Sequence, residues 1–251
     1  MEGNWLDMAV VKGGSTVYGG AVGFLMLETQ FPRIRGDVGN YGTWDFPAIY
    51  EIVPKALPSG VIGVDIDQEL VEAFLAGGRN LIRKGARVIG TSCGYLSAIQ
   101  PILTKELGVP VVTSSLVQVP LVSSIVGRES PIGILTERPQ LDDSYFTAAG
   151  WKPTDYDVRV GSFREDSYFP QVFIDNSPFA DMEQLNSDIH LAVEDLVTTH
   201  PDVRAIVFEC TNFVPFSKSL RERFGLPIFD YHTAITNVHN AVVGPAFAPT
   251  I

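Results

Sequence analysis

Short runs of apolar residues recur along the chain and alternate with longer segments of helical period. The run Val22–Leu27 is almost continuously apolar, as strands buried on both faces are. Residues 67–84 repeat apolar positions at helical spacing and begin at Asp67, a residue type that caps helix N-termini. Strands that alternate with helices predict parallel sheets covered by helices on both faces. We therefore predict an α/β fold.

The same patterns predict the remaining elements. In chain order they are a helix over 46–57, a strand over 60–64, a helix over 96–107, a strand over 109–113, a helix over 139–149, a strand over 155–161 and a helix over 179–199. Residues 28–40 are rich in Gly, Pro, Asp and Asn, which predicts a long irregular loop. Residues 1–20 have little period and predict a loosely packed arm.

The sequence contains an internal repeat centred on its two cysteines, Cys93 and Cys210. Each cysteine ends an apolar strand and precedes a predicted helix. Aligned on the cysteines without a gap, the two segments also match Arg87 with Arg204, Ile89 with Ile206, Leu103 with Leu220, Gly108 with Gly225, and Pro110 with Pro227. Residues 132–135 likewise repeat the pattern of residues 22–25. The repeat predicts two similar α/β units that meet at about residues 117–128.

Composition and charge exclude several classes of protein. The chain has 251 residues, of which 45% are hydrophobic, with a formal net charge of −11. This charge argues against binding to nucleic acid or to anionic membranes, which both need a basic surface. No apolar run approaches the ~20 residues of a membrane span, and no signal peptide is visible. We expect a cytoplasmic protein with free thiols and a small anionic or carbonyl-containing substrate, and the sequence leaves a homo-oligomer possible.

The positions of the two cysteines indicate acid–base chemistry. In open α/β sheets, ligands bind beyond the carboxyl ends of the strands, where both thiols are expected. The N-terminus of a helix favours a thiolate, because its N–H groups and dipole stabilise negative charge. Two opposed thiols could remove a proton from one face of a carbon and return a proton to the other. The alternative is that each cysteine is a small apolar core residue.

The segments Thr91-Ser-Cys93-Gly and Cys210-Thr-Asn-Phe, together with the duplicated layout, resemble the aspartate/glutamate racemase superfamily. This superfamily includes aspartate, glutamate and hydantoin racemases, maleate isomerases and arylmalonate decarboxylases. The resemblance extends over about residues 22–242. It implies two pseudo-symmetric flavodoxin-like domains, 1–120 plus 229–251 and 121–228, with the active-site cleft between them. It also implies chemistry without a cofactor or a metal.

The resemblance implies a set of site residues. Cys93 and Cys210 match the two acid–base thiols. Residues matching positions that contact the substrate are Ser92, Gly94, Thr113, Ser114, Ser115, Thr136, Thr211 and Asn212.

Two further candidates come from the residues themselves. Arg33 could clamp a substrate carboxylate or be a solvated loop residue, and His232 could bind substrate, tune Cys210 or be structural. Glu209 directly precedes Cys210, and alternation along a strand places it on the opposite face.

The function predicted from these features is a cofactor-independent racemase or epimerase, an isomerase of amino-acid metabolism. It would act at a carbon next to a carboxylate or carbonyl, in an amino acid or a hydantoin. Cys93-Gly-Tyr and Cys210-Thr-Asn differ from the Cys-Asn-Thr and Cys-Thr-His of glutamate racemases, so the substrate stays undecided. A maleate-type isomerase, an arylmalonate-type decarboxylase and a non-catalytic small-molecule binding protein are the alternatives.

Overall fold

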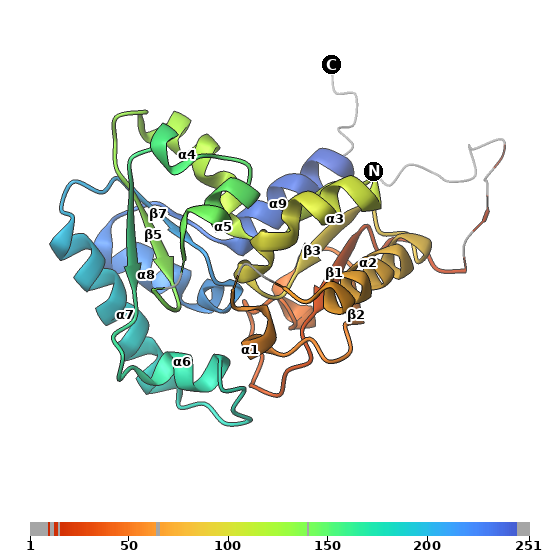
Figure 1. Cartoon of the computed structure of the whole chain (residues 1–251), viewed down its shortest axis with the longest axis horizontal. Coiled ribbons are helices and arrows are strands. Elements are labelled where there is room, and N and C mark those ends of the chain that lie inside the picture. The colour runs from red at the N-terminus through yellow and green to blue at the C-terminus, as the bar shows by residue number, and fades with distance from the viewer. Residues whose placement is uncertain (1–9, 11–12, 15, 64–65, 140, 245–251) are drawn as a thin grey trace, which may run out of the picture.

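The chain folds into two parallel sheets, each flanked by helices (Figure 1). The computed structural model describes residues 10, 13–14, 16–63, 66–139 and 141–244. The predicted N-terminal arm, residues 1–20, lies mostly outside these residues. In the described part, one four-stranded sheet has the order β2-β1-β3-β4 and the other has the order β6-β5-β7-β8. The two orders are the same when the second set of strands is counted from β5, as an internal repeat requires.

Each half contains four strands, and in each half the third strand is followed by a 3-10 helix, an α-helix and the fourth strand. The first half contains β1 (Val22–Met26), η2 (Tyr41–Thr43), β2 (Ala48–Ile52), α1 (Pro58–Val61), α2 (Gln68–Arg83), β3 (Val88–Thr91), η3 (Gly94–Ile99), α3 (Gln100–Leu107), β4 (Val111–Val112), η4 (Ser115–Gln118) and α4 (Val119–Val126). The second half contains β5 (Ile132–Thr136), α5 (Asp143–Ala148), η5 (Pro153–Asp155), β6 (Val158–Ser162), α6 (Tyr168–Phe173), α7 (Met182–Thr199), β7 (Ala205–Phe208), η6 (Thr211–Phe216), α8 (Ser217–Phe224), β8 (Ile228–Phe229) and α9 (Tyr231–Val242). The label η marks a 3-10 helix.

The first strand of each half, β1 or β5, is an inner strand of its sheet and sends alternate side chains to opposite faces. In β1, Leu25 packs in one cluster with residues of α2, while Phe24 packs in another with residues of α9. In β5, Leu135 packs with residues of α7 and Ile134 packs with residues of α4. Both strands are buried along their whole length, which explains their continuous apolar sequences. The two-domain α/β fold predicted from the sequence is confirmed.

Two matched glycines close the helices that follow the cysteines. Gly108 ends α3 with φ = 67° and Gly225 ends α8 with φ = 66°, both in the left-handed region. Glycine adopts this conformation at little steric cost and commonly ends helices in this way. Each glycine is followed by a two-residue strand, β4 or β8. The alignment of the two cysteine segments therefore corresponds to a real structural repeat.

Three elements differ from those predicted. The helix expected over 46–57 is wrong, because residues 48–52 form β2, a strand paired with β1. Its β-branched and aromatic residues favour a strand at the sheet edge over a helix. The strand expected over 60–64 is also wrong, because the helix α1 begins at Pro58, and Val64 lies outside the described residues. The single helix expected over 96–107 is divided into η3 and α3.

The hydroxyl of Tyr231 joins the chain end to the first sheet. Its oxygen donates to the Val112 carbonyl at 2.7 Å and accepts from the Thr91 backbone N–H at 2.6 Å, and the side chain is fully buried. We expect Tyr231→Phe to lower the free energy of unfolding by about 1–3 kcal/mol, because two buried backbone groups lose their partner. Urea denaturation measures this loss. Tyr41→Phe, at an exposed ring, is the matched control and should change stability by less than about 0.5 kcal/mol.

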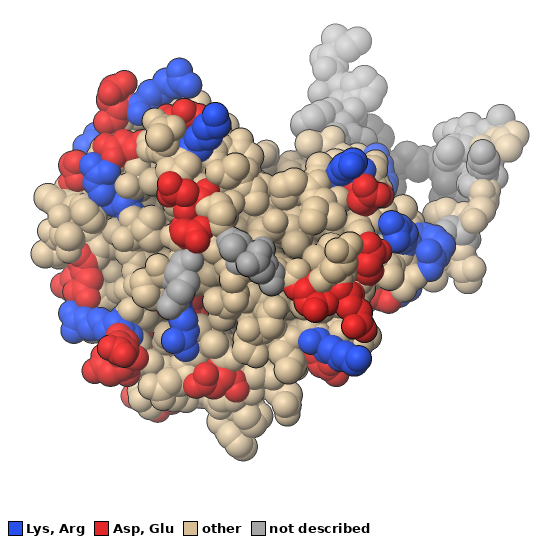
Figure 2. Space-filling view, viewed as in Figure 1, with Lys and Arg blue, Asp and Glu red and all other residues tan. Residues whose placement is uncertain are grey.

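Acidic and basic side chains are intermixed over the face of the molecule that Figure 2 shows. Among the described residues, no helix combines the length and the apolar content that a membrane crossing needs.

Candidate active site

The two thiols lie at equivalent positions in the two domains and face one pocket. Cys93 precedes η3 and Cys210 precedes η6, each with an extended backbone at the N-cap. Both are free cysteines; Cys210 is buried and Cys93 is half-buried. We call the pocket that they line the thiol pocket. Its lining residues are Leu27, Phe31, Pro58, Ile62, Ser92, Cys93, Tyr95, Glu137, Phe173, Ile174, Cys210 and Asn212.

The thiol pocket is narrow. Its volume is about 20 Å³, close to the space that one water molecule needs. Pro58 and Ile62 line it from the first domain, and Phe173 and Ile174 line it from the end of α6 in the second. A ligand larger than water therefore fits only if lining residues move apart.

A buried carboxyl group, Glu137, contacts one of the thiols. Glu137 directly follows β5, and its Oε2 accepts a hydrogen bond from the Cys210 Sγ at 3.4 Å. Its Oε1 is buried and has no hydrogen-bond partner among the described residues. The side chain is 5% exposed. Glu137 also lines a second, larger cavity of about 290 Å³, which we call the outer cavity.

A second buried carboxyl group, Glu209, lies beside the first cysteine segment. Its Oε2 accepts from the Thr136 hydroxyl at 3.1 Å, and that hydroxyl is 3.2 Å from the Tyr95 hydroxyl. A Cβ atom at Gly94 would lie 2.1 Å from both the Glu209 carbonyl oxygen and its Oε1. The Glu209 carboxyl therefore lies against the first cysteine segment, and its direction relative to the Cys210 side chain stays a prediction.

Burial and mutual repulsion favour the neutral forms of all four groups. Burial raises the pKa of Glu137 to about 8, with a further contribution from the Glu209 carboxyl. Burial also raises the pKa of Glu209 to about 8. The pKa values of Cys93 and Cys210 are raised by burial first and by the two carboxyls second.

Backbone N–H groups act in the opposite direction on both thiols, but their effect is smaller. Those of Tyr95 and Leu96 lower the pKa of Cys93, and that of Asn212 lowers the pKa of Cys210. The expected stabilisation of a thiolate by the helix N-terminus is thus present, and burial outweighs it in the ligand-free molecule.

The structure gathers part of the predicted set of substrate contacts around the thiols. Ser92 and Asn212 line the thiol pocket, and Asn212 Oδ1 is buried without a partner among the described residues. The Thr211 hydroxyl donates to the Ser92 carbonyl at 2.8 Å, which joins the two cysteine segments across the domains. Gly94 and Thr136 contact Glu209, as described above.

Three other residues of the set, Thr113, Ser114 and Ser115, lie after β4 outside the lining of the thiol pocket. Thr113 bonds to the Gln100 side chain through its N–H and its hydroxyl. The Ser114 hydroxyl caps η4. Ser115 is buried, and its hydroxyl has no partner among the described residues. A substrate contact by any of these residues stays a prediction.

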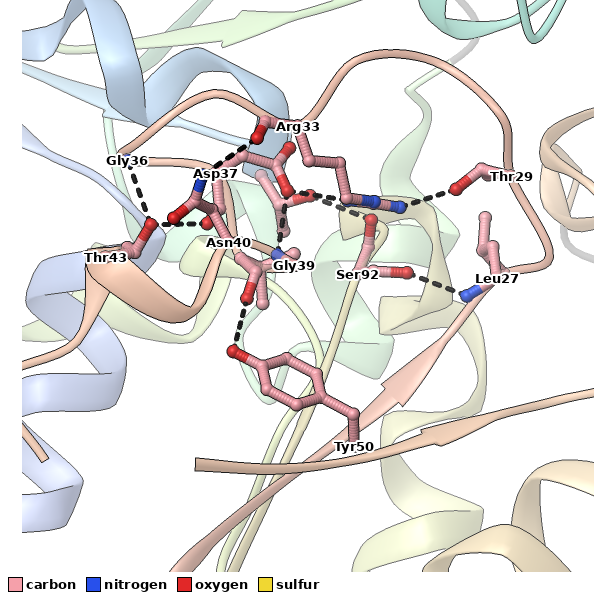
Figure 3. Close-up of polar contacts among 12 residues, drawn as sticks. Leu27, Thr29, Arg33, Gly36, Asp37, Gly39, Asn40, Thr43, Tyr50 and Ser92 are labelled. Carbon is pink, nitrogen blue, oxygen red and sulfur yellow. Dashed lines mark hydrogen bonds and ion pairs between the residues drawn. The ribbon is translucent and has the colours of Figure 1, made fainter. Parts of the chain in front are cut away.

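Arg33 and His232 also lie outside the lining of the thiol pocket. Figure 3 shows the Arg33 guanidinium between Asp37 and Thr29, with hydrogen bonds of 2.7 Å to each. This network orders the loop after β1, and Arg33 lines a separate cavity beside β1 and β2. The His232 ring stacks on Trp44 with centroids 5.2 Å apart. Substrate contacts by Arg33 or His232 stay predictions.

Sequence reasoning missed Glu137 and the aromatic residues Phe31, Tyr95 and Phe173. Glu137 has the same signal as the cysteines, since it follows the carboxyl end of a buried strand. The aromatic rings have no such signal, because they come from a loop, from η3 and from α6. Among the described residues, no group of three or more His, Cys, Asp or Glu residues is arranged to hold a metal ion.

Comparison with solved structures identifies the fold. Glutamate racemase from Bacillus anthracis matches with a TM-score of 0.58, covering 90% of this chain and 84% of its own, at 15% identity. Arylmalonate decarboxylase matches with a TM-score of 0.55, covering 90% of this chain and 95% of its own, at 16% identity. Both belong to the aspartate/glutamate racemase superfamily. The chain has the racemase-superfamily fold. No family model matches its sequence.

The curated relatives have another activity. Dimethylsulfoniopropionate lyase from Durusdinium sp. clade D is 28% identical over 221 residues, which are 84% of this chain and 71% of the relative. Dimethylsulfoniopropionate lyase 3 from Emiliania huxleyi is 25% identical over 230 residues, which are 87% of this chain and 58% of the relative. The chain thus spans about three-fifths to seven-tenths of the length of these relatives.

These relatives overturn the predicted activity. They support an enzyme acting on a small molecule, but their names are those of lyases. The prediction of a racemase or isomerase of amino-acid metabolism is therefore wrong. The substrates considered with it, namely amino acids, hydantoins and unsaturated or geminal diacids, do not include a sulfonium compound. The predicted fold is therefore correct, and the predicted reaction is wrong.

Proposed function

We propose that this chain is a dimethylsulfoniopropionate lyase. The observation that carries the proposal is the similarity to dimethylsulfoniopropionate lyases over 84–87% of the chain. The substrate has a carboxylate at one end and a positively charged dimethylsulfonium group at the other. The charge and the polar lining of the thiol pocket support this assignment independently.

The reaction is a β-elimination that begins with removal of a proton. A thiolate takes a proton from the carbon next to the carboxylate, and the S–H bond forms as that C–H bond breaks. The C–H electron pair becomes the double bond of acrylate. The bond between the next carbon and sulfur breaks, and its electron pair leaves with sulfur as neutral dimethyl sulfide. We assign the base to Cys210, because its thiol contacts a carboxyl group that can accept its proton.

The charge of the thiol pocket suits a cationic group. Among the described residues that line it there is no Lys, Arg or His, whereas Glu137 is present and Glu209 is close. The rings of Phe31, Tyr95 and Phe173 add surfaces that attract cations. A dianionic substrate would raise the pKa values of these acids further. A sulfonium cation stabilises both the carboxylates and a thiolate, so substrate binding itself promotes ionisation of the base.

The carboxylate of the substrate needs hydrogen-bond donors, and the thiol pocket supplies them near Cys93. Ser92 and Asn212 supply polar side chains in the thiol pocket, and the backbone N–H groups of Tyr95 and Leu96 face the Cys93 sulfur. N–H groups at a helix start bind anions well. With its carboxylate held there and its sulfonium near Glu137, the substrate places the carbon that loses its proton between the two thiols. We assign Cys93 to the positioning of that carbon.

The proposal is tested by incubating the purified chain with dimethylsulfoniopropionate and measuring dimethyl sulfide in the headspace and acrylate by NMR. Equal amounts of the two products are expected. Deuterium on the carbon next to the carboxylate should slow product formation, because that C–H bond breaks in the reaction. 3-(Methylthio)propionate, which has the carboxylate but no positive charge, is the matched control and should release no volatile sulfide. A folded protein that releases no dimethyl sulfide above the protein-free rate would overturn the assignment.

A further inference from the structure

The proposed lyase reaction, on which this inference rests, must release a proton to solvent in each turnover, whereas racemisation does not. Inversion of a carbon centre returns a proton for each proton removed. Elimination leaves one additional proton on the base after each turnover. In this molecule the base is buried in a pocket of about 20 Å³, so the proton requires a route to solvent.

Glu137 lies on the boundary between the thiol pocket and solvent. It lines the thiol pocket and also the outer cavity, whose volume is about 290 Å³. The outer cavity is lined by Glu137, Arg138, Pro139, Phe163, Arg164, Glu165, Ser167, Pro170 and Gln171. Arg164, Glu165 and Gln171 are exposed, so the outer cavity opens to water.

The two oxygens of Glu137 have different environments. Oε2 accepts the hydrogen bond of the Cys210 thiol at 3.4 Å. Oε1 is buried and has no hydrogen-bond partner among the described residues, an arrangement that is costly for a carboxyl group unless water or a proton satisfies it. One oxygen therefore already contacts the proton donor, and the other is available for the next transfer.

We propose that Glu137 carries the proton from Cys210 to the outer cavity after each turnover. When the sulfonium group of the next substrate binds beside them, the S–H bond of Cys210 breaks and an O–H bond forms on Glu137, which regenerates the thiolate. The O–H bond of Glu137 then breaks, and the proton passes to water in the outer cavity. No other reactant is consumed, and one proton leaves for each acrylate formed.

The groups that face Glu137 allow proton exchange near neutral pH. Burial and the Glu209 carboxyl raise its pKa, and the Cys210 thiol and Arg138 lower it, with a result of about 8. Glu209 has a similar pKa, but its Oε2 is bonded to Thr136 and it does not line the outer cavity. Glu137 is therefore the buried carboxyl placed for transfer to solvent.

Glu137→Gln distinguishes proton transfer from simple attraction of the sulfonium group. The amide keeps the size of the side chain but does not accept a proton at neutral pH. We expect kcat to fall by about 10- to 100-fold, with KM within about threefold of wild type. Small buffers such as imidazole should partly restore kcat, since the outer cavity can admit them. Glu129→Gln, at an exposed carboxyl that lines neither cavity, should leave kcat and KM unchanged.

Two outcomes would contradict the proposal. If KM rises while kcat stays within twofold of wild type, Glu137 binds substrate and does not carry the proton. If kcat and KM both stay within twofold of wild type, the proton leaves by another route.

A second readout does not depend on lyase activity. In a Cys93→Ser background, the rate at which iodoacetamide alkylates Cys210 is measured against pH. The Glu137 carboxylate raises the pKa of Cys210, so Glu137→Gln should move the rise in that rate to lower pH. A wild type that forms no dimethyl sulfide refutes the lyase assignment, and an unchanged alkylation profile refutes the contact through which Glu137 would take the proton.

Discussion

Replacement of Cys210 by serine is expected to slow dimethyl sulfide release by at least about 10³-fold, within the range that general base catalysis contributes. The hydroxyl is nearly the same size as the thiol but is a far weaker acid, so it does not supply an anionic base at neutral pH. The contact with Glu137 can persist, because an O–H donates at least as well as an S–H. Binding should therefore change much less than turnover, and kcat and KM measured on the variant separate the two.

Cys93→Ser is the comparison for this prediction. Cys93 is assigned to positioning, so we expect a loss of about 10- to 100-fold in kcat. Thermal unfolding of both variants should stay close to wild type, which would exclude a general loss of structure. Retention of more than a tenth of the wild-type rate by Cys210→Ser would refute the thiol base. If kcat falls further in Cys93→Ser than in Cys210→Ser, Cys93 is the base and Cys210 the positioning residue.

Replacement of Gly94 by alanine is expected to have the largest effect on stability. The added Cβ would lie 2.1 Å from the carbonyl oxygen of Glu209, so a backbone segment of the other domain must move. Overpacking of this kind costs about 1–3 kcal/mol or more. The shift also moves Cys210, the next residue, and turnover should fall by at least about 10-fold, since small displacements of reacting groups are costly. Urea denaturation and the lyase assay measure the two effects.

Gly60→Ala is the matched control for this substitution. A Cβ at Gly60 has no heavy atom within 4 Å, and the residue lies in the short helix α1. Its stability should be unchanged or slightly higher, because alanine favours helix. If Gly94→Ala is as stable and as active as Gly60→Ala, the contact between the two cysteine segments does not set the geometry of the site.

The sequence allowed the repeat to be predicted because its signals are local. An apolar strand, a cysteine, a helix and a closing glycine follow one another in both halves, and Gly108 and Gly225 have the same left-handed conformation. Local signals failed at residues 46–64, where a strand at the sheet edge and a one-turn helix replaced the predicted helix and strand. Both elements are short, and their identity depends on the neighbours that they pack against.

The reaction could not be predicted from the cysteine motifs, because a racemase and a lyase share the removal of a proton next to a carboxylate. They differ at the leaving group, and the residues that would contact it come from separate segments of the chain. Glu137 and Phe173 do not form a motif with Cys210, and only folding brings them to one pocket.

In the proposed lyase reaction, the raised pKa values of the thiols would protect the two cysteines from the product. Acrylate is an electrophile, and its double bond can alkylate a thiolate but reacts poorly with a protonated thiol. When the sulfonium leaves as neutral dimethyl sulfide, the positive charge that favoured a thiolate leaves with it. Burial and the carboxyls then favour the protonated thiols while acrylate is still nearby. An environment that makes the proposed base depend on its substrate would thus also protect that base from the product.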